Sequence, residues 1–307
     1  MSAELLVDSL PSWNEGATKT AIVGFLEAVQ SVPVDQRVAV FDIDGTLWCE
    51  KPNYVQAEFL LGELGAAIAR DPTLGDRDEY RAMLEHDLTL QAELGLERIA
   101  LALVELCAGI GPSEFDERVR TFFTHAVHPG RNVPYRAMRY APMLELIEAL
   151  RTNEFDVFLV TGGGTEFVRA ISQDFYGVSP EGVVGTLVRY RFTRVDGRPR
   201  LVREAVLDAS AANEGEAKVS NIQRELGRHP IFAAGNTAGD REMLEYAVAF
   251  EGPSLALLVD HDDTEREHAY TAQAGTIDFE GDIVEFGRGL GWTIVSMSDD
   301  WASVFGT

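Results

Sequence analysis

The sequence predicts an α/β fold in which a mostly parallel sheet is covered by helices on both faces. Short, continuous apolar runs recur along the chain, and amphipathic stretches separate them, which is the pattern of buried parallel strands joined by helices. The runs are VAVF (38–41), VFLV (157–160), IFAA (231–234), LALLV (255–259) and WTIVSM (292–297). Because ligands bind beyond the carboxyl ends of the strands in such sheets, the residues that follow each run are candidates for a site.

Composition restricts the class of partner. The chain has 307 residues and a net charge of −24, and no run approaches the roughly 18 apolar residues of a membrane span. Such an acidic surface repels nucleic-acid phosphates and anionic lipids, so we expect no nucleic-acid partner and no membrane partner. The first residues lack the basic start of a signal peptide, and Cys49 and Cys107 have no disulfide or metal spacing. We therefore expect a cytoplasmic protein.

An all-helical block follows the first apolar run and breaks the alternation of strands and helices. Gly and Pro punctuate the block, which reads as four helices. These helices are 53–70, 77–94, 96–110 and 113–127. We expect a helical cap domain over residues 49–129, inserted into an α/β core domain formed by residues 1–48 and 130–307.

Two other segments belong to the expected core. Residues 1–36 contain one predicted helix, which Asn14 or Thr18 would cap. Residues 183–202 alternate in polarity around the Asp-Gly pair at 196–197, which predicts a β-hairpin on the rim of the sheet.

Two carboxylates follow the first run. Residues two apart on an extended chain point to the same side, so Asp42 and Asp44 face one spot, and Gly45 permits the sharp turn after them. Acids this close repel each other unless a cation lies between them. The pair suits a divalent metal, with one carboxylate as nucleophile and the other as proton donor and acceptor. A solvated loop in an acidic protein is the alternative.

Thr161 and three glycines follow the second run and precede another helical stretch. A hydroxyl group and glycine-freed backbone amides, that of Gly162 first, can hold a phosphate at a helix N-terminus. A flexible connection between strand and helix is the alternative.

The third run is preceded by Lys218 and followed by Asn236 and Asp240. Lys218 is one of three lysines, the other 23 basic residues being arginines, so a specific role is more plausible for it than for an ordinary surface lysine. Amide and carboxylate oxygens are ligands of hard cations. A solvated Lys218 and a helix cap at Asp240 are the alternatives.

Together these residues resemble the motifs of the haloacid dehalogenase superfamily, in its phosphatase branch. DIDGT (42–46) is similar to the nucleophile motif of that family, Thr161 to its hydroxyl motif, Lys218 to its lysine motif and GNTAGD (235–240) to its acidic motif. The motifs occur in the family's order. The resemblance implies a Rossmann-like core, and the helical block resembles the four-helix cap of the phosphoserine phosphatase-like group.

The resemblance implies a phosphatase that hydrolyses a phosphomonoester of a small metabolite. Asp42 would attack phosphorus and become an aspartyl phosphate. Asp44 would protonate the leaving oxygen and then activate water. Thr161, the Gly162 amide and Lys218 would hold the phosphoryl group.

By the same resemblance, Mg²⁺ would be bound by Asp42, the backbone carbonyl of Asp44 and Asn236, with support from Asp240. Asn236 replaces the family's usual acid, and a neutral ligand should weaken Mg²⁺ binding. Dehalogenases lack an acid at the position of Asp44, so its presence favours phosphoryl chemistry. A phosphotransferase or mutase and a weakly catalytic phosphate-binding module remain alternatives.

Two weaker candidates complete the set. HDD (261–263) lacks metal-ligand spacing and is predicted to be a loop cap. Trp48, Tyr54 and Glu58 lie at the junction with the expected cap, where substrate contact and core packing are both open. The sequence specifies neither the substrate nor the oligomeric state.

Overall fold

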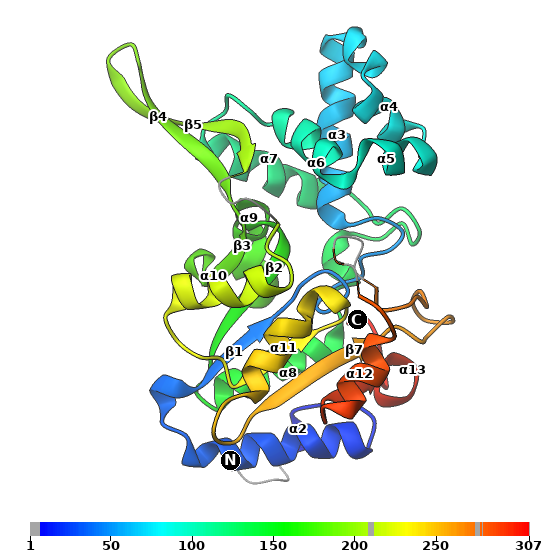
Figure 1. The fold of residues 1–307 in the computed structure, drawn as a ribbon, viewed down its shortest axis with the longest axis vertical. Coiled ribbons are helices and arrows are strands. Elements are labelled where there is room, and N and C mark those ends of the chain that lie inside the picture. The colour runs from blue at the N-terminus through cyan, green and yellow to red at the C-terminus, as the bar shows by residue number, and fades with distance from the viewer. Residues whose placement is uncertain (1–6, 208–211, 274–276, 278, 307) are drawn as a thin grey trace.

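A six-stranded parallel sheet forms the centre of the computed structural model, which describes residues 7–207, 212–273, 277 and 279–306. The strand order is β3-β2-β1-β6-β7-β8, and β4 and β5 form a separate antiparallel pair (Figure 1). The strands are β1 (Val38–Phe41), β2 (Asp156–Gly164), β3 (Val183–Thr186), β4 (Val188–Val195), β5 (Arg198–Leu207), β6 (Phe232–Gly235), β7 (Leu255–Asp260) and β8 (Thr293–Ser296). The predicted α/β class is confirmed, and each of the five apolar runs overlaps a strand. Strand β2 continues through residues 161–164, however, which were expected to follow it.

Helices lie on both faces of the sheet and beyond one of its ends (Figure 1). They are α2 (Ala17–Ala28), α3 (Val55–Arg70), α4 (Asp78–Leu84), α5 (Leu88–Leu94), α6 (Leu96–Glu105), α7 (Pro112–His125), α8 (Ala141–Thr152), α9 (Thr165–Tyr176), α10 (Glu216–Leu226), α11 (Arg241–Val248), α12 (Ile283–Gly289) and α13 (Met297–Asp300). In the part of the chain that the structure describes, none of them combines the length and apolar content needed to cross a bilayer.

The central position of β1 in the sheet explains why its sequence is continuously apolar. Val38 and Val40 pack into one buried cluster, whereas Ala39 and Phe41 pack into the cluster on the opposite face of the sheet. A strand covered on both faces has no solvent side, so the usual polar alternation is lost. Because β1 pairs in parallel with β2 on one side and β6 on the other, the carboxyl ends of these three strands lie together.

The hairpin begins later in the chain than the sequence indicates. Val183–Thr186, assigned to the hairpin, is instead the edge strand β3, paired in parallel with β2 and largely buried. The hairpin itself is β4 and β5, joined at Asp196 and Gly197, whose φ angles are 49° and 77°. Two left-handed residues are what a tight hairpin turn requires, so the turn prediction is confirmed.

The helical block contains five α-helices rather than four. The expected helix 77–94 breaks into α4 and α5 at His86, which has a φ of 52°. The next residue, Asp87, accepts the amides of Thr89 (3.1 Å) and Leu90 (3.0 Å) and so caps α5. An Asp that can cap a new helix competes with continuation of the old one.

The predicted cap of the first helix is wrong. Helix α2 follows Gly16, and no side chain caps it. Asn14 donates instead to the Asp299 carbonyl (2.7 Å) and Thr18 to the Asp300 carboxylate (2.9 Å). These polar groups tie the two ends of the described chain together, which sequence spacing could not reveal.

Candidate active site

Lys218 joins two carboxylates at the carboxyl ends of β1 and β6. Its Nζ lies 2.6 Å from Asp42 Oδ1 and 2.6 Å from Asp240 Oδ1, and all three residues are buried. Burial alone would lower the pKa of Lys218, but the charges of Asp240 and Asp42 outweigh it and raise that pKa. Burial and the charge of Asp240 raise the pKa of Asp42, and the charge of Lys218 lowers it in part. The predicted meeting of Lys218, Asp42 and Asp240 is observed.

Asp240 uses both of its oxygens within the chain. Oδ1 accepts from Lys218, and Oδ2 accepts the amides of Asn236 (3.0 Å) and Thr237 (3.1 Å). Asp240 thus caps the short turn that follows β6 and holds Lys218 in place. The predicted cap is therefore observed together with the contact to Lys218, and the role of Asp240 in supporting a metal stays a prediction.

Asp44 is held by an indole group. Trp48 Nε1 donates to Asp44 Oδ1 at 2.7 Å, while the Trp48 ring is buried and stacks on Phe123 with 5.9 Å between centroids. Burial raises the pKa of Asp44 to about 7, although the indole hydrogen bond lowers it in part. A carboxyl group that titrates near neutrality can both give and take a proton. Of the two readings of Trp48, packing is observed, together with this unforeseen bond.

The turn after Asp44 has no room for a side chain. Gly45 has a φ of 73°, and a methyl group there would overlap the Asn236 amide and come within 2.9 Å of the Tyr270 hydroxyl. His261 Nε2 lies 2.7 Å from the Gly45 carbonyl oxygen and braces the turn from the other side. Gly45 therefore allows both the backbone reversal and the close approach of the β6 loop.

His261 belongs to a buried polar network that the sequence analysis missed. Its Nδ1 lies 3.3 Å from Glu267 Oε2, and Glu267 Oε1 accepts from the Tyr140 hydroxyl at 3.0 Å. Burial alone would raise the pKa of Glu267, but the hydrogen bond and charge of His261 lower it to about 2. The segment after β7 thus supports the turn at Gly45.

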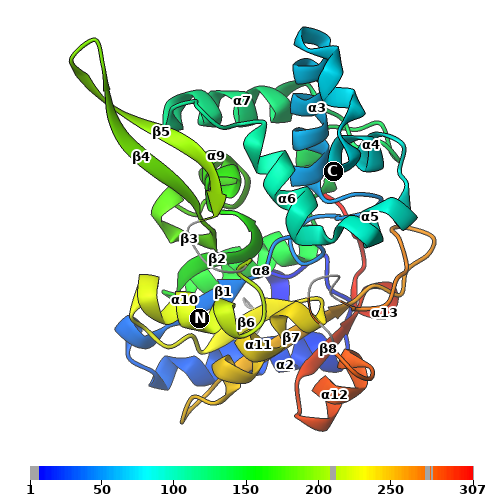
Figure 2. The same cartoon turned by 45° about the horizontal axis from the view of Figure 1, so that its top comes forward.

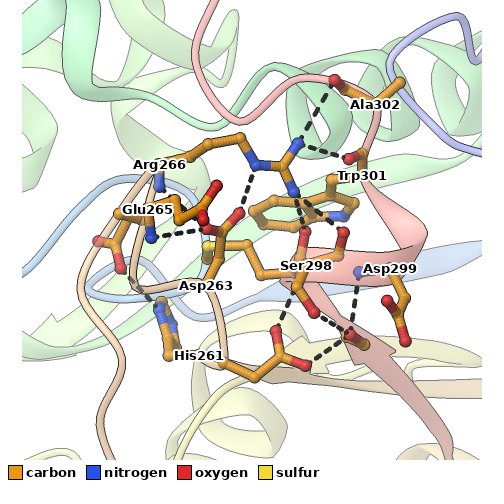
Figure 3. A network of polar contacts seen from close by, with 12 residues as sticks. His261, Asp263, Glu265, Arg266, Ser298, Asp299, Trp301 and Ala302 are labelled. Atoms are coloured by element: carbon orange, nitrogen blue, oxygen red, sulfur yellow. Dashed lines mark hydrogen bonds and ion pairs between the residues drawn. The ribbon is translucent and has the colours of Figure 1, made fainter.

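The same segment is anchored to the end of the described chain, as Figure 3 shows. Asp263 Oδ1 accepts the amides of Glu265 (3.0 Å) and Arg266 (2.9 Å), so the predicted loop cap at 261–263 is observed. The Arg266 guanidinium pairs with Asp263 and donates to the backbone carbonyls of Trp301 (2.8 Å) and Met297 (2.8 Å). His261 is thereby held on a rigid support.

The glycines after Thr161 let side chains approach the backbone. Thr161 is buried, and its hydroxyl accepts the Gly163 amide at 2.9 Å, which leaves its proton free to donate. Gln56 of α3 accepts the Gly164 amide at 2.7 Å, and a methyl group on Gly163 or Gly164 would come within 2.9 Å of it. Gln56 links the helical block to this loop, and no sequence signal distinguished it.

Glu214 is a further site residue that the sequence analysis missed. A methyl group on Gly162 or on Gly239 would overlap its carboxylate, so Glu214 lies between the end of β2 and the turn that follows β6. Burial raises the pKa of Glu214 to about 7, and Lys218 lowers it in part. An acid in so acidic a chain carries no signal of its own, although it lies four residues before Lys218.

The oxygens beside Asp42 are of the kind that a hard divalent cation takes. The Thr46 hydroxyl lies 3.4 Å from both Asp42 Oδ2 and Asn236 Oδ1, so these two oxygens face the same hydroxyl group. Within the described residues no three His, Cys, Asp or Glu side chains are grouped to hold a metal, so amide or carbonyl oxygens would have to complete the set. The carboxylates around Lys218 outnumber its single charge, and a dication would offset the excess.

A family model matches the sequence of this chain, and solved structures share its fold. The model for haloacid dehalogenase-like hydrolases matches residues 39–245. The chain therefore belongs to the haloacid dehalogenase-like hydrolase family, as its motifs predicted. No curated protein matches the sequence.

Three solved structures illustrate the likeness. A protein of unknown function from Bordetella pertussis Tohama I is 18% identical with a TM-score of 0.52, over 85% of this chain and 99% of that one. A functionally unknown protein from Anaerococcus prevotii DSM 20548 is 16% identical with a TM-score of 0.57, over 94% of each chain. A phosphoserine phosphohydrolase-like protein from Francisella tularensis subsp. tularensis SCHU S4 is 17% identical with a TM-score of 0.40, over 83% and 99%. The first two likenesses show the fold alone.

Proposed function

We propose that this hydrolase is a Mg²⁺-dependent phosphatase that acts on a phosphomonoester of a small metabolite. One observation carries the proposal: Lys218 bridges Asp42 and Asp240 at 2.6 Å each, and Asp44, whose pKa is about 7, lies two residues from Asp42. A carboxylate paired with a buried ammonium beside a proton donor is suited to phosphoryl transfer, which needs positioning and charge neutralisation above all.

In the first step Asp42 attacks phosphorus. The bond from phosphorus to the leaving oxygen breaks, and Asp44 gives its proton to that oxygen. An aspartyl phosphate remains on Asp42. The raised pKa of Asp44, about 7, keeps a substantial fraction protonated at neutral pH, so the leaving group departs as a neutral alcohol.

In the second step Asp44, now a carboxylate, takes a proton from water as the water oxygen attacks phosphorus. The bond between phosphorus and the Asp42 oxygen breaks, which frees inorganic phosphate and restores Asp42. The Thr161 hydroxyl, the Gly162 amide and the Lys218 ammonium would hold the phosphoryl oxygens in both steps. Trp48 keeps Asp44 pointing at the reacting oxygen through its 2.7 Å hydrogen bond.

The residues that would hold Mg²⁺ are Asp42, Asn236 and the backbone carbonyl of Asp44, with Asp240 in support through Lys218. When bound, the ion neutralises charge that develops on the transferring group. Asn236 carries no charge, so we expect a weaker affinity for Mg²⁺ than an aspartate there would give.

Helices α3 to α7 would act as the cap that encloses the substrate, and we retain the proposed division into a cap at 49–129 and a core formed by 1–48 and 130–307. Support comes from Gln56 at the start of α3, which accepts the Gly164 amide at 2.7 Å and so links the helical block to the end of β2. Such a cover excludes water before the attack and selects the leaving group.

The test is phosphate release from a panel of phosphorylated metabolites, with and without Mg²⁺. Replacing the nucleophile, Asp42→Asn, should abolish Mg²⁺-dependent release, because the amide cannot form the phosphoenzyme. The matched control Asp35→Asn changes an exposed acid and should keep full activity. Release that persists in Asp42→Asn, or no release from any substrate while inorganic phosphate still binds, would contradict the proposal.

A further inference from the structure

The hairpin formed by β4 and β5, residues 188–207, extends away from the body of the protein in both views (Figures 1 and 2). We call it the arm. Its charge is opposite to that of the rest of the chain, since it carries six arginines and two acids in a protein with a net charge of −24. A projecting arm of the opposite charge is a feature that phosphatase chemistry does not require.

One face of the arm is packed at its base and bare farther out. The cross-strand pair Tyr190 and Arg203 contacts Glu166 of α9, and Arg203 is buried. The next pair on the same face is Phe192 and Leu201, which are 61% and 48% exposed. An apolar cross-strand pair normally packs against another element, but here the Arg194 guanidinium lies 5.7 Å from the centroid of the Phe192 ring and both side chains of the pair remain exposed.

The arginines of the arm form ion pairs near its base but, among the described residues, form none toward its tip. Near the base, Arg189 and Arg191 pair with Glu204 at 2.7 and 3.1 Å. Toward the tip, Arg194, Arg198 and Arg200 make no ion pair with any residue that the structure describes. The tip therefore offers charge and apolar surface together.

Helices α4 and α5 carry acidic residues and exposed leucines, which complement the arginines and apolar residues of the arm. We call this surface the α4–α5 patch. Residues 78–94 carry five acids and one arginine. Leu84 and Leu88 are 44% and 76% exposed there. Glu85 and Glu93 are exposed and, among the described residues, form no ion pair. Exposed leucines beside unpaired acids complement exposed Phe192 and Leu201 beside unpaired arginines.

The tip of the arm cannot reach the patch of its own chain. Ala205 at the base of the arm lines one pocket with Glu79 and Leu94, but both views place the tip of the arm and α4–α5 on opposite sides of the helical block, with α6 between them (Figures 1 and 2). A second copy offers the same patch without that restriction, and a two-fold axis would make the contact twice, because each arm then reaches the other copy.

We propose that the protein forms a two-fold dimer in which the arm of each copy docks on the α4–α5 patch of the other. Phe192 and Leu201 cover Leu84 and Leu88, and Arg194 lies near Glu85. The dimer does not depend on the proposed phosphatase activity, since it uses none of the site residues. Charge complementarity selects the partner here, and the apolar pairs supply the buried area.

The test measures molar mass by light scattering and the dissociation constant by analytical ultracentrifugation. Wild type should be a dimer at micromolar concentration, and Phe192→Ser and Arg194→Glu should each raise the dissociation constant at least about tenfold. The control Arg224→Glu, an exposed arginine on α10, should leave it unchanged. Circular dichroism would establish that every variant is folded.

Exchanging the charges of Glu85 and Arg194 tests whether these two residues contact each other across the dimer. Glu85→Arg alone should weaken the dimer, and Glu85→Arg combined with Arg194→Glu should restore most of the affinity, because both reciprocal contacts regain opposite charges. A monomeric wild type would overturn the proposal. So would a dimer that tolerates Phe192→Ser and Arg194→Glu, or a double variant as weak as the sum of the single ones.

Discussion

Asp44 and Trp48 form a pair whose titration should control the pH dependence of the reaction. Burial raises the pKa of Asp44 to about 7, and the Trp48 indole, which favours the carboxylate, lowers it in part. The first step needs protonated Asp44, so kcat/KM should fall as the pH rises through about 7. Trp48→Phe removes the indole donor and should move this fall to higher pH.

The measurement is kcat/KM from pH 5 to 9 for wild type and Trp48→Phe. Trp292→Phe is the control, because among the described residues the Trp292 indole is buried without a hydrogen-bond partner. Its profile should match wild type. A Trp48→Phe profile that is scaled down but not shifted would mean that Asp44 is not the titrating acid.

Glu214 should oppose phosphate binding. Its carboxylate lies against Gly162, where we place the phosphoryl group, and like charges in a partly dry site repel strongly. Glu214→Gln keeps the shape and removes the charge, so inorganic phosphate should inhibit it at concentrations about tenfold lower. Glu216→Gln, an exposed acid nearby, is the control. Unchanged or weaker inhibition in Glu214→Gln would show that the carboxylate moves away or binds protonated.

The sequence predicts the site residues that lie in motifs near strand ends, but it does not predict those that reach the site through tertiary packing. Asp42, Lys218 and Asp240 directly follow strands or belong to short motifs, and the parallel sheet brings their strand ends together. Gln56 and Glu214 reach the site through helix orientation and through space left by glycines. Such contacts depend on tertiary packing, which no local pattern encodes.

At the level of elements, the segment after β7 should stabilise the fold most strongly above pH 4.5. The folded-state pKa of Glu267 is about 2, below its ordinary value of 4.5, so its stabilisation is present above 4.5 and is lost as the pH falls through about 2. That shift corresponds to about 3 kcal/mol. Glu267→Gln should therefore lose up to about 3 kcal/mol of unfolding free energy at pH 7 and much less near pH 2.

Urea unfolding of Glu267→Gln and wild type across this pH range measures the difference, with the exposed Glu265→Gln as control. Since His261 joins Glu267 to the Gly45 carbonyl, the variant should also lose activity while still folded. A difference in stability that stays constant with pH would assign the loss to packing rather than to the charge of Glu267.

Elements were predicted well where their pattern was long and poorly where one residue decided the boundary. The five apolar runs became strands because burial on both faces requires continuous apolar sequence. The split at His86 and the strand at 183–186 depended on a cap and on an edge position in the sheet. The strand at 183–186 is settled by pairing with β2, whereas the split at His86 depends on a local cap at Asp87 that competes with the helical pattern.

At the scale of the whole molecule, net charge and topology act on function in different ways. The strand order brings β2, β1 and β6 side by side and so assembles the site, as the sequence led us to expect for a parallel sheet. The charge of −24 instead acts over distance and opposes the approach of any anionic substrate. At the site, the charges of Lys218 and Lys51 act on the carboxylates, and the dication that we propose would add to them.

The net charge therefore gives a prediction about ionic strength. Salt from about 0.01 M to 0.15 M shortens the screening length from about 30 Å to about 8 Å, which weakens the long-range repulsion more than the contacts within the site. For a dianionic phosphomonoester at constant Mg²⁺, kcat/KM should rise about two- to fivefold. We expect kcat to stay constant, because it does not include the encounter of substrate and enzyme. A substrate of similar size that carries an ammonium group should respond less. If kcat/KM falls with salt instead, the local positive field of the site and the arm governs the approach, and the overall charge of the protein does not.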